Sequence, residues 1–438
     1  MNERESEAIS SVLQKRGFDI VTDEHSADIV LLNTCSVREQ AELKAIGKSN
    51  LVARDNKLQI LGILGCMAQN LGEQLLKLSP HVRLIVGPTG LAKIPEYIDY
   101  LLTHPKEHII DTNYSAIDSV FASAHDLKQI GASAYVSIMQ GCNMRCAYCI
   151  VPKTRGPECY RPIDAILEEI QKLAEHGVKE ITLLGQIVNN YGFKQIPIVN
   201  GKSPFVQLLE KIQTIDGIER IRFTSPHPKG FKSDLIDAYR DLSKLCPYVH
   251  LPLQSGSNKI LRAMKRPYTQ EQFLDIIAAL RDRVPTISIS TDIIVGFPGE
   301  DDADFEATCK VFDAVKFDMA YIFKYSIRPG TEAAQLGDQI ATEIKEARNQ
   351  ILLKKLEKYS QAYNDAMIGK TYKVLVDGHA RKGIDRFEGR TPEHKKVIFL
   401  GKPDQIGQIV DVTIERATSS TLEGTLNDKS ISSPSTKI

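Results

Sequence analysis

Short apolar runs alternate with amphipathic helical patterns over the first 325 residues, and this alternation limits the chain to an α/β fold. In the first hundred residues the apolar runs predict strands and the segments between them predict helices. The expected strands are 28–33, 58–65 and 83–86, and the expected helices are 5–16, 38–54 and 91–102. Continuous apolar strands between helices are typical of an open parallel sheet covered on both faces.

Six further strand-then-helix units follow a linker of mixed polarity. Their expected strands are 135–139, 180–184, 220–223, 248–251, 288–295 and 320–325. Repeated β/α units predict a full or partial barrel, in which the chemistry lies at the carboxyl ends of the strands.

The spacing of the apolar residues changes towards the end of the chain. A long charged helix over 341–367 leads into short alternating runs separated by glycines, which predict a small antiparallel β-barrel. The expected domains are 1–103, 128–358 and 367–430, with a linker over 104–127 and a disordered tail over 431–438.

The overall composition is that of an ordinary globular protein. Lys and Arg number 55 and so do Asp and Glu, so no global positive charge indicates a nucleic-acid partner. No apolar run approaches the roughly 20 residues that span a bilayer, and the charged start from Met1 to Glu7 does not resemble a signal peptide. We therefore expect a cytoplasmic protein with no membrane partner. Eight cysteines in such a chain favour metal or cluster ligation over disulfides.

Three of these cysteines, Cys142, Cys146 and Cys149, follow a glycine with the spacing CxxxCxxC. Three thiolates on a 4Fe-4S cluster leave one iron open to a small molecule. Such a cluster can pass one electron to the sulfonium of S-adenosylmethionine and so start radical chemistry. The alternative is a zinc site, but structural zinc generally takes four protein ligands and no second cysteine pair is near in sequence. The spacing favours the radical cluster.

Several residues near the ends of the expected strands are placed to hold S-adenosylmethionine. Tyr148 could pack on the adenine, the turn from Gly296 to Glu300 offers free backbone groups, and Gln186 and Gln254 could contact the polar end of the molecule. The alternative for each of them is an ordinary structural role.

Cys35 and Cys66 each fall just past the carboxyl end of an expected strand, where open α/β sheets place their ligand sites. They could share a second cluster, and the alternative is that both are buried core residues. The remaining three cysteines are not grouped with other candidate ligands in the sequence, and we interpret them as structural. They are Cys159, Cys246 and Cys309.

Basic residues gather within a short span of the expected C-terminal barrel, beside Phe387 and His394. They are Arg381, Lys382, Arg386, Arg390, Lys395 and Lys396. Small barrels commonly bind oligonucleotides on one face, and basic residues with aromatic neighbours suit RNA phosphates and stacking. The alternative is a solvated surface, because acidic residues are interleaved with the basic ones.

Ordered motifs across the chain resemble those of the radical S-adenosylmethionine methylthiotransferase family. The N-terminal motifs are NTCSVREQAE around Cys35 and LGCMAQ around Cys66. The central motifs are CNMRCAYCIVPKTRG, LLGQIVNNYG, RIRFTSPHPKGF, HLPLQSGSNKILRAMKR and TDIIVGFPGE. The tail resembles the TRAM domain of that family, so the likeness covers nearly the whole chain.

This resemblance implies two 4Fe-4S clusters and S-adenosylmethionine as cofactors. The radical cluster would sit on Cys142, Cys146 and Cys149, and an auxiliary cluster on three N-terminal cysteines that include Cys35 and Cys66. One S-adenosylmethionine would methylate a sulfur on the auxiliary cluster. A second would yield the radical that removes hydrogen from carbon 2 of an N(6)-dimethylallyl adenosine next to the tRNA anticodon, and the methylthio group would then be transferred. The TRAM domain and the crevice between domains would hold the anticodon arm.

The sequence departs from the family pattern at its start. The family's first cysteine comes immediately before a segment like Met1 to Glu7, and neither that cysteine nor its strand is present. We expect the true start to lie upstream, because a missing strand would leave sheet groups unpaired. The alternative is a chain with two auxiliary thiolates.

The resemblance also sets the rival functions and the expected partners. Siblings of the family modify threonylcarbamoyl-adenosine in tRNA or a ribosomal protein, and a rival of another class is an RNA-binding protein with structural clusters. The expected partners are a one-electron reductant such as flavodoxin or ferredoxin and an iron-sulfur assembly or sulfur-donor protein, and the expected state is a monomer.

Overall fold

The N-terminal part of the chain is a four-stranded parallel sheet with the order β1-β2-β3-β4. The structure is a computed structural model that describes residues 1–36, 39–55, 60–114, 125–127, 130–383 and 385–427. The strands are β1 (Ile29–Thr34), β2 (Ile60–Gly65), β3 (Leu84–Val86) and β4 (Ile109–Asp111). This sheet confirms the expected open parallel fold.

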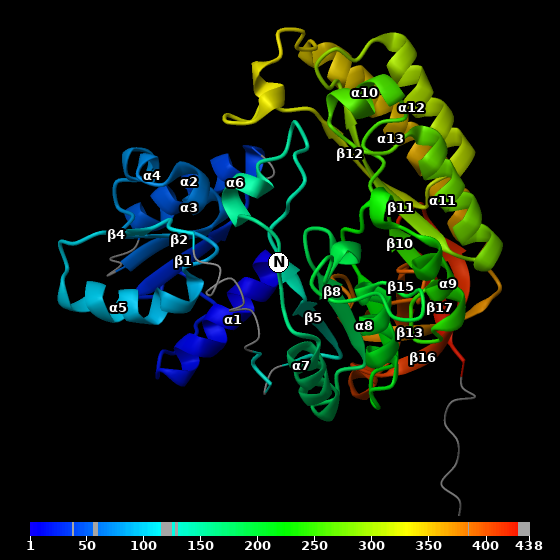
Figure 1. The fold of residues 1–438 in the computed structure, drawn as a ribbon. Helices are drawn as coiled ribbons and strands as arrows, with labels where there is room; N and C mark the ends of the chain where they lie inside the picture. Colours follow the sequence, from blue (N-terminus) through cyan, green and yellow to red (C-terminus); the bar gives the residue numbers. More distant parts are fainter. Residues whose placement is uncertain (37–38, 56–59, 115–124, 128–129, 384, 428–438) are drawn as a thin grey trace, which may run out of the picture.

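Helices pack on both faces of that sheet (Figure 1). One face carries α1 (Asn2–Lys15) and α5 (Ile94–Thr103), the latter preceded by η1 (Leu91–Lys93). The other face carries α2 (Glu39–Asp55), α3 (Cys66–Leu71) and α4 (Gln74–Leu78). Residue 38, where the second helix was expected to begin, lies outside the described residues.

The sheet extends further along the chain than its sequence pattern indicates. Ile109–Asp111 falls in the segment expected as a linker, but it forms β4 and pairs in parallel with β3. The signal was weak because the strand has only three residues, and its sequence neighbours are charged or polar. The expected disordered tail, 431–438, lies outside the described residues.

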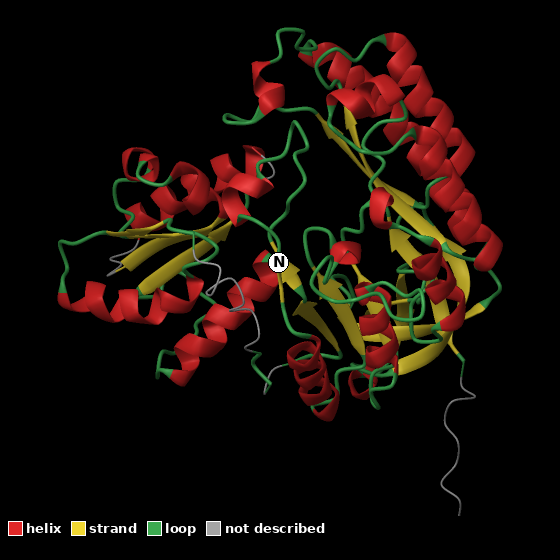
Figure 2. Ribbon diagram, viewed as in Figure 1, coloured by secondary structure: helices red, strands yellow, loops and turns green. Residues whose placement is uncertain are grey.

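The central part is a partial barrel of two three-stranded parallel sheets, with the orders β5-β8-β9 and β10-β11-β12. Figure 2 shows the strands forming a curved layer with helices along its outer side. The strands are β5 (Ser133–Ser137), β8 (Glu180–Leu184), β9 (Arg220–Phe223), β10 (Tyr248–His250), β11 (Ser288–Val295) and β12 (Met319–Lys324). The six expected strands are therefore all present, within two residues at each end.

The helices and short elements of this part complete the β/α alternation. The helices are α6 (Val151–Arg155), α7 (Ile163–Glu175), α8 (Pro204–Gln213), α9 (Ser233–Asp241), α10 (Asn258–Ala263), α11 (Gln270–Arg283), α12 (Asp302–Val315) and α13 (Thr342–Asp365). The shorter elements are β6 (Met139–Gln140), β7 (Cys159–Tyr160), η3 (Val188–Asn190), η4 (Pro228–Gly230) and η5 (Glu332–Gln335). One large apolar core, which includes Val136, Leu183 and Ile289, fills the space between the strands and their helices.

The C-terminal part is a closed five-stranded barrel with the order β13-β14-β15-β17-β16. Its elements are β13 (Thr371–His379), β14 (Arg386–Arg390), β15 (Lys396–Leu400), η6 (Pro403–Gln405), β16 (Ile409–Ala417) and β17 (Leu422–Leu426). Neighbouring strands are antiparallel except for β15 and β17, which pair in parallel. Apart from that one pair, the expected small antiparallel barrel is confirmed.

Two buried arginines of β9 attach this small barrel to the central part. Arg222 donates to the carbonyl oxygens of Thr391 and Pro392, at 2.8 Å each, and it pairs with Glu180 at 3.0 Å. Arg220 donates to two further carbonyls of the small barrel, those of Arg390 at 2.9 Å and Lys373 at 2.8 Å. The two domains are therefore joined by buried charge-assisted hydrogen bonds to main-chain oxygens.

We expect Arg222→Ala to destabilise the protein by about 1.5–3 kcal/mol, because it removes buried charge-assisted hydrogen bonds and leaves the Glu180 carboxylate with Arg220 alone, at 3.6 Å. Urea unfolding followed by circular dichroism measures the loss. Arg240→Ala is the matched control, since the pair of Arg240 with Asp241 is exposed, and it should unfold like the wild type. Wild-type stability in Arg222→Ala would contradict the assignment.

Candidate cluster-binding active site

The loop that carries the three grouped cysteines is fixed at both ends by main-chain hydrogen bonds. Gly141 has a positive φ of 79°, and a side chain there would collide with the carbonyl of Pro157. The amide of Cys142 donates to the carbonyl of Gly156 at 3.0 Å, and the amide of Cys149 donates to that of Cys146 at 3.0 Å. The glycine before the first cysteine is therefore required by the fold of the loop.

The middle of the loop is tied to distant segments of the central part. The amide of Ala147 donates to the carbonyl of Met264 at 3.0 Å, and the carbonyl of Ala147 accepts from the amide of Ala333 at 2.8 Å. These contacts hold the cysteines at the carboxyl ends of the barrel strands, where such folds place their chemistry.

The three thiols suit a cluster better than a single ion. Burial raises the pKa of Cys142 to about 11 and that of Cys149 to about 12, so cluster binding must displace their protons. In the described part of the chain, no three His, Cys, Asp or Glu side chains come close enough together to hold one metal ion. Ligands of a cluster sit on separate irons, so three thiols in one half-buried loop fit a 4Fe-4S group.

A buried arginine that the sequence did not single out contacts one of these sulfurs. Arg266 donates from Nη1 to Cys146 Sγ at 3.4 Å and from Nε to the hydroxyl of Tyr268 at 3.0 Å. Its guanidinium lies 5.1 Å from the centre of the Tyr268 ring. The only available signal was its position at the end of the motif HLPLQSGSNKILRAMKR.

His227 lies against the same group of side chains, with its ring 5.5 Å from that of Tyr268. Burial and the nearby charge of Arg266 lower the pKa of His227 to about 2, so the imidazole is neutral at physiological pH. Its Nδ1 accepts from the amide of Lys229 at 3.1 Å, which leaves the proton on Nε2. That nitrogen is buried and has no hydrogen-bond partner among the described residues.

The expected S-adenosylmethionine residues Tyr148, Gly296 and Glu300 have two different surroundings. Tyr148 packs edge-on against Phe297, with 6.4 Å between the ring centres, and it directly precedes Cys149 in the chain. Glu300 instead accepts from the amide of Gly296 at 2.9 Å and from Arg348 at 2.8 Å. Its carboxylate therefore holds the shape of its own turn, and we expect it to act on a ligand only through that turn.

The two glutamines occupy strand ends as expected. Gln186 follows β8, and its Oε1 is buried with no hydrogen-bond partner among the described residues. Gln254 is buried, and its main chain, with a φ of 70°, bridges to β11 through Ile293 and Ile294. Gln140 Nε2, at the end of β6, is likewise buried and unpartnered in the described chain. Unpaired polar atoms gathered at strand ends are typical of a ligand site.

Strand register brings Cys35 and Cys66 together. Thr34 at the end of β1 lies opposite Gly65 at the end of β2, so the two cysteines that follow leave the sheet side by side. Cys66 is buried and Cys35 is half-buried. Burial raises the pKa of the Cys66 thiol, and the neighbouring Cys35 adds to the rise. The pair suits two ligands of one group, and no third ligand accompanies it among the described residues.

A buried charge network joins α1 of the N-terminal domain to α7 of the central part. His125 hydrogen-bonds to Glu7 through Nδ1 at 2.9 Å and to Glu169 through Nε2 at 2.7 Å. Glu7 also pairs with Arg4 at 3.1 Å, and Glu169 with Arg161 at 2.6 Å. Burial by itself would lower the pKa of His125, but the hydrogen bonds to the two carboxylates raise it overall.

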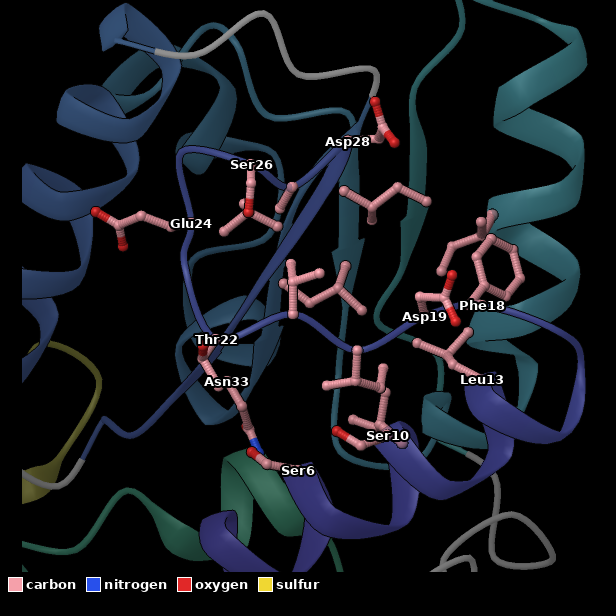
Figure 3. A pocket seen from close by; sticks show the side chains of 18 of the residues that line it. Ser6, Ser10, Leu13, Phe18, Asp19, Thr22, Glu24, Ser26, Asp28 and Asn33 are labelled. Atoms are coloured by element: carbon pink, nitrogen blue, oxygen red, sulfur yellow. The ribbon is translucent and has the colours of Figure 1, made fainter.

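A separate pocket opens between α1, the segment 17–28 and β1 (Figure 3). Leu13 and Phe18 line it on the apolar side, and Ser6 lies at its other end, where its hydroxyl accepts from Asn33 Nδ2 at 3.1 Å. Its lining contains no cysteine, so it is distinct from the two cysteine groups.

The basic residues of the small barrel divide into three sets. Lys395 points inward, pairs with Asp318 at 3.2 Å and lies 4.3 Å from the centre of the Tyr363 ring. It therefore belongs to the domain contact rather than to an RNA surface. Three more are paired with carboxylates of the same barrel: Arg386 with Glu423, Arg390 with Asp377, and Lys396 with Glu388. Arg381 and Lys382 are exposed.

Three family profiles match the chain. Residues 1–87 match Uncharacterized protein family UPF0004, residues 136–312 match the Radical SAM superfamily, and residues 365–426 match the TRAM domain. Among solved structures, a radical S-adenosylmethionine methyltransferase from Kitasatospora setae has a TM-score of 0.57 at 15% identity, covering 76% of this chain and 72% of that one. That likeness supports the fold alone. The profiles and the cysteine loop define the class as a radical S-adenosylmethionine core with a TRAM domain.

Curated relatives narrow the class to one family. A tRNA-2-methylthio-N(6)-dimethylallyladenosine synthase of Opitutus terrae is 50% identical over 97% of this chain and 95% of its own length. Synthases of the same name from Methylacidiphilum infernorum and Yersinia pseudotuberculosis are 48% and 42% identical, over 97% of this chain and 92% and 90% of their own lengths. The chain belongs to the tRNA-2-methylthio-N(6)-dimethylallyladenosine synthase family.

We expect Cys146→Ala to lower the iron content of the anaerobically reconstituted protein by about four atoms per chain. Formation of 5'-deoxyadenosine from S-adenosylmethionine should fall to background in the same variant. Cys309→Ala, in the buried face of α12, is the control and should keep both. Full iron content in Cys146→Ala would reject Cys146 as a ligand.

Because the pKa of His125 is raised on folding, its stabilising effect is complete below its ordinary pKa of about 6.5 and is lost as pH rises through the folded value. The unfolding temperature of the wild type should therefore fall between about pH 6 and about pH 9 more steeply than that of His125→Gln. Thermal scans across this range test the expectation. The control is His176→Gln, which changes an exposed histidine on the same side of the junction and should follow the wild type. Identical slopes of unfolding temperature against pH in all three proteins would refute the role of His125.

Proposed function

We propose that this protein converts N(6)-dimethylallyl adenosine next to the tRNA anticodon to its 2-methylthio derivative, by radical C–H activation with S-adenosylmethionine. The observation that carries the proposal is the 50% identity with a synthase of that name over 97% of the chain. Three ordered domain matches support it, because they cover the N-terminal, central and C-terminal parts of the chain.

Cys142, Cys146 and Cys149 would hold the radical cluster, and Cys35 and Cys66 would be ligands of the auxiliary one. A bound radical cluster supplies the electron that cleaves S-adenosylmethionine. The residues around it would orient that cofactor and keep water away. Tyr148 and Phe297 provide an apolar wall, and the orphaned Oε1 of Gln186 is an acceptor for a polar group of the ligand.

The TRAM domain, residues 365–426, is the part of the chain that we propose binds the tRNA substrate. We assign the first contact with RNA phosphates to Arg381 and Lys382, because the other basic residues of the cluster are paired or buried. We further propose that the reaction requires a one-electron reductant and a sulfur donor as partner proteins. The enzyme would act as a monomer in the cytoplasm, where tRNA is matured. In the described part of the chain no helix has the length and apolar character needed to cross a membrane.

Mass spectrometry of tRNA nucleosides tests the function directly. A strain that lacks the gene should lose 2-methylthio-N(6)-dimethylallyl adenosine and accumulate its unmodified precursor. The wild-type gene should restore the product and the Cys146→Ala gene should not. An unchanged product level in the deletion strain would reject the proposal. Loss of methylthio groups from threonylcarbamoyl-adenosine or from a ribosomal protein instead would favour a sibling activity.

A further inference from the structure

One buried arginine reaches from the cysteine loop to the other cysteine pair. Arg155 is the last residue of α6, the helix that begins two positions after Cys149. Its side chain is 4% exposed, and its Nε donates to Cys66 Sγ at 3.2 Å. The helix that follows the cysteine loop therefore contacts a cysteine of the N-terminal domain through one side chain.

The remaining donors of this guanidinium are held by α1. Nη1 and Nη2 donate to the two carboxylate oxygens of Glu5 at 2.6 and 3.1 Å, and Nη2 also contacts Asn2 Oδ1 at 3.3 Å. Glu5 is also only 4% exposed, so this is a fully buried bidentate pair. The carboxylate of Glu5 thus fixes Nη1 and Nη2, the two-pronged end or fork of the Arg155 guanidinium, and Nε is left to donate to the sulfur of Cys66.

The hydrogen bond from Arg155 Nε suits a sulfur that carries negative charge. A cluster-bound cysteine is a thiolate, and an N–H donor on a ligand sulfur makes a cluster easier to reduce. A buried carboxylate beside the same arginine has the opposite effect. Arg155 and Glu5 therefore place two charges with opposite effects on the reduction potential next to Cys66.

We propose that Arg155 is a positioning residue for the auxiliary cluster. Through Nε it orients the Cys66 sulfur and raises the reduction potential of the cluster bound there, and through α6 it fixes that cluster relative to the radical loop. Glu5 holds the fork in place and offsets part of the charge. This inference rests on the proposed function, because it takes Cys66 to be a cluster ligand.

Two substitutions give opposite expected shifts. Arg155→Lys keeps the charge but loses the fork and Nε, so the midpoint potential of the auxiliary cluster should become more negative. Glu5→Gln keeps an acceptor for the fork but removes the offsetting charge, so the potential should become more positive. Lys153→Ala is the matched control. It lies in the same helix and contacts Asn70 across the same junction at 3.1 Å, away from the sulfur, so it should shift neither cluster.

The experiment is a potentiometric titration of the reconstituted full-length proteins, followed by electron paramagnetic resonance. The radical cluster is identified by the change that S-adenosylmethionine causes in its signal, and it should keep its wild-type potential in all variants. Circular dichroism and 5'-deoxyadenosine formation confirm that each variant is folded and that its radical site works.

Opposite shifts confined to the auxiliary signal would support the inference. Unchanged potentials, shifts in the same direction, equal shifts of both clusters, or a wild-type protein with one cluster only would each overturn it. Methylthiolation of tRNA by the wild type is scored separately. If it fails, the proposed function falls, whereas unmoved potentials in an active enzyme reject only the role of Arg155.

Discussion

Strands in the two α/β domains run parallel within each sheet, apart from the short pair β6 and β7, so the carboxyl ends of neighbours meet at one edge. The candidate site residues follow those ends: Cys35, Cys66, the loop that begins at Cys142, Gln186, Gln254 and His227. In the N-terminal sheet the register of β1 with β2 sets Cys35 beside Cys66, and no other contact is needed to pair them. The position of the chemistry is thus a consequence of strand direction before any side chain contributes.

Buried charges connect the three domains. Arg155 with Glu5, and His125 with Glu7 and Glu169, join the N-terminal domain to the centre. Arg222 pairs with Glu180 inside the centre and donates to carbonyl oxygens of the small barrel. Such pairs cost much of their attraction in desolvation but require a defined geometry. That geometry is what two metal groups acting on one substrate require, since an error of about 1 Å in reacting groups can cost a hundredfold in rate.

The fold was largely predictable from the sequence, because strand and helix periods are local properties. The six barrel strands followed from apolar runs, and the Cys142 loop from its spacing. The short strand β4 was not predictable, since it depends on pairing with β3 for its stability. Arg155, Arg266 and His227 were also missed as site residues. Arg155 and Arg266 contact sulfurs 89 and 120 positions away in sequence, and no local pattern encodes such contacts.

The small barrel is docked through its backbone. Arg220 and Arg222 donate only to carbonyl oxygens on that side, those of Lys373, Arg390, Thr391 and Pro392. These four acceptors are present whatever residue occupies each position, as long as the chain keeps its path. The exposed side chains of the barrel can therefore vary without loosening its attachment to the central domain.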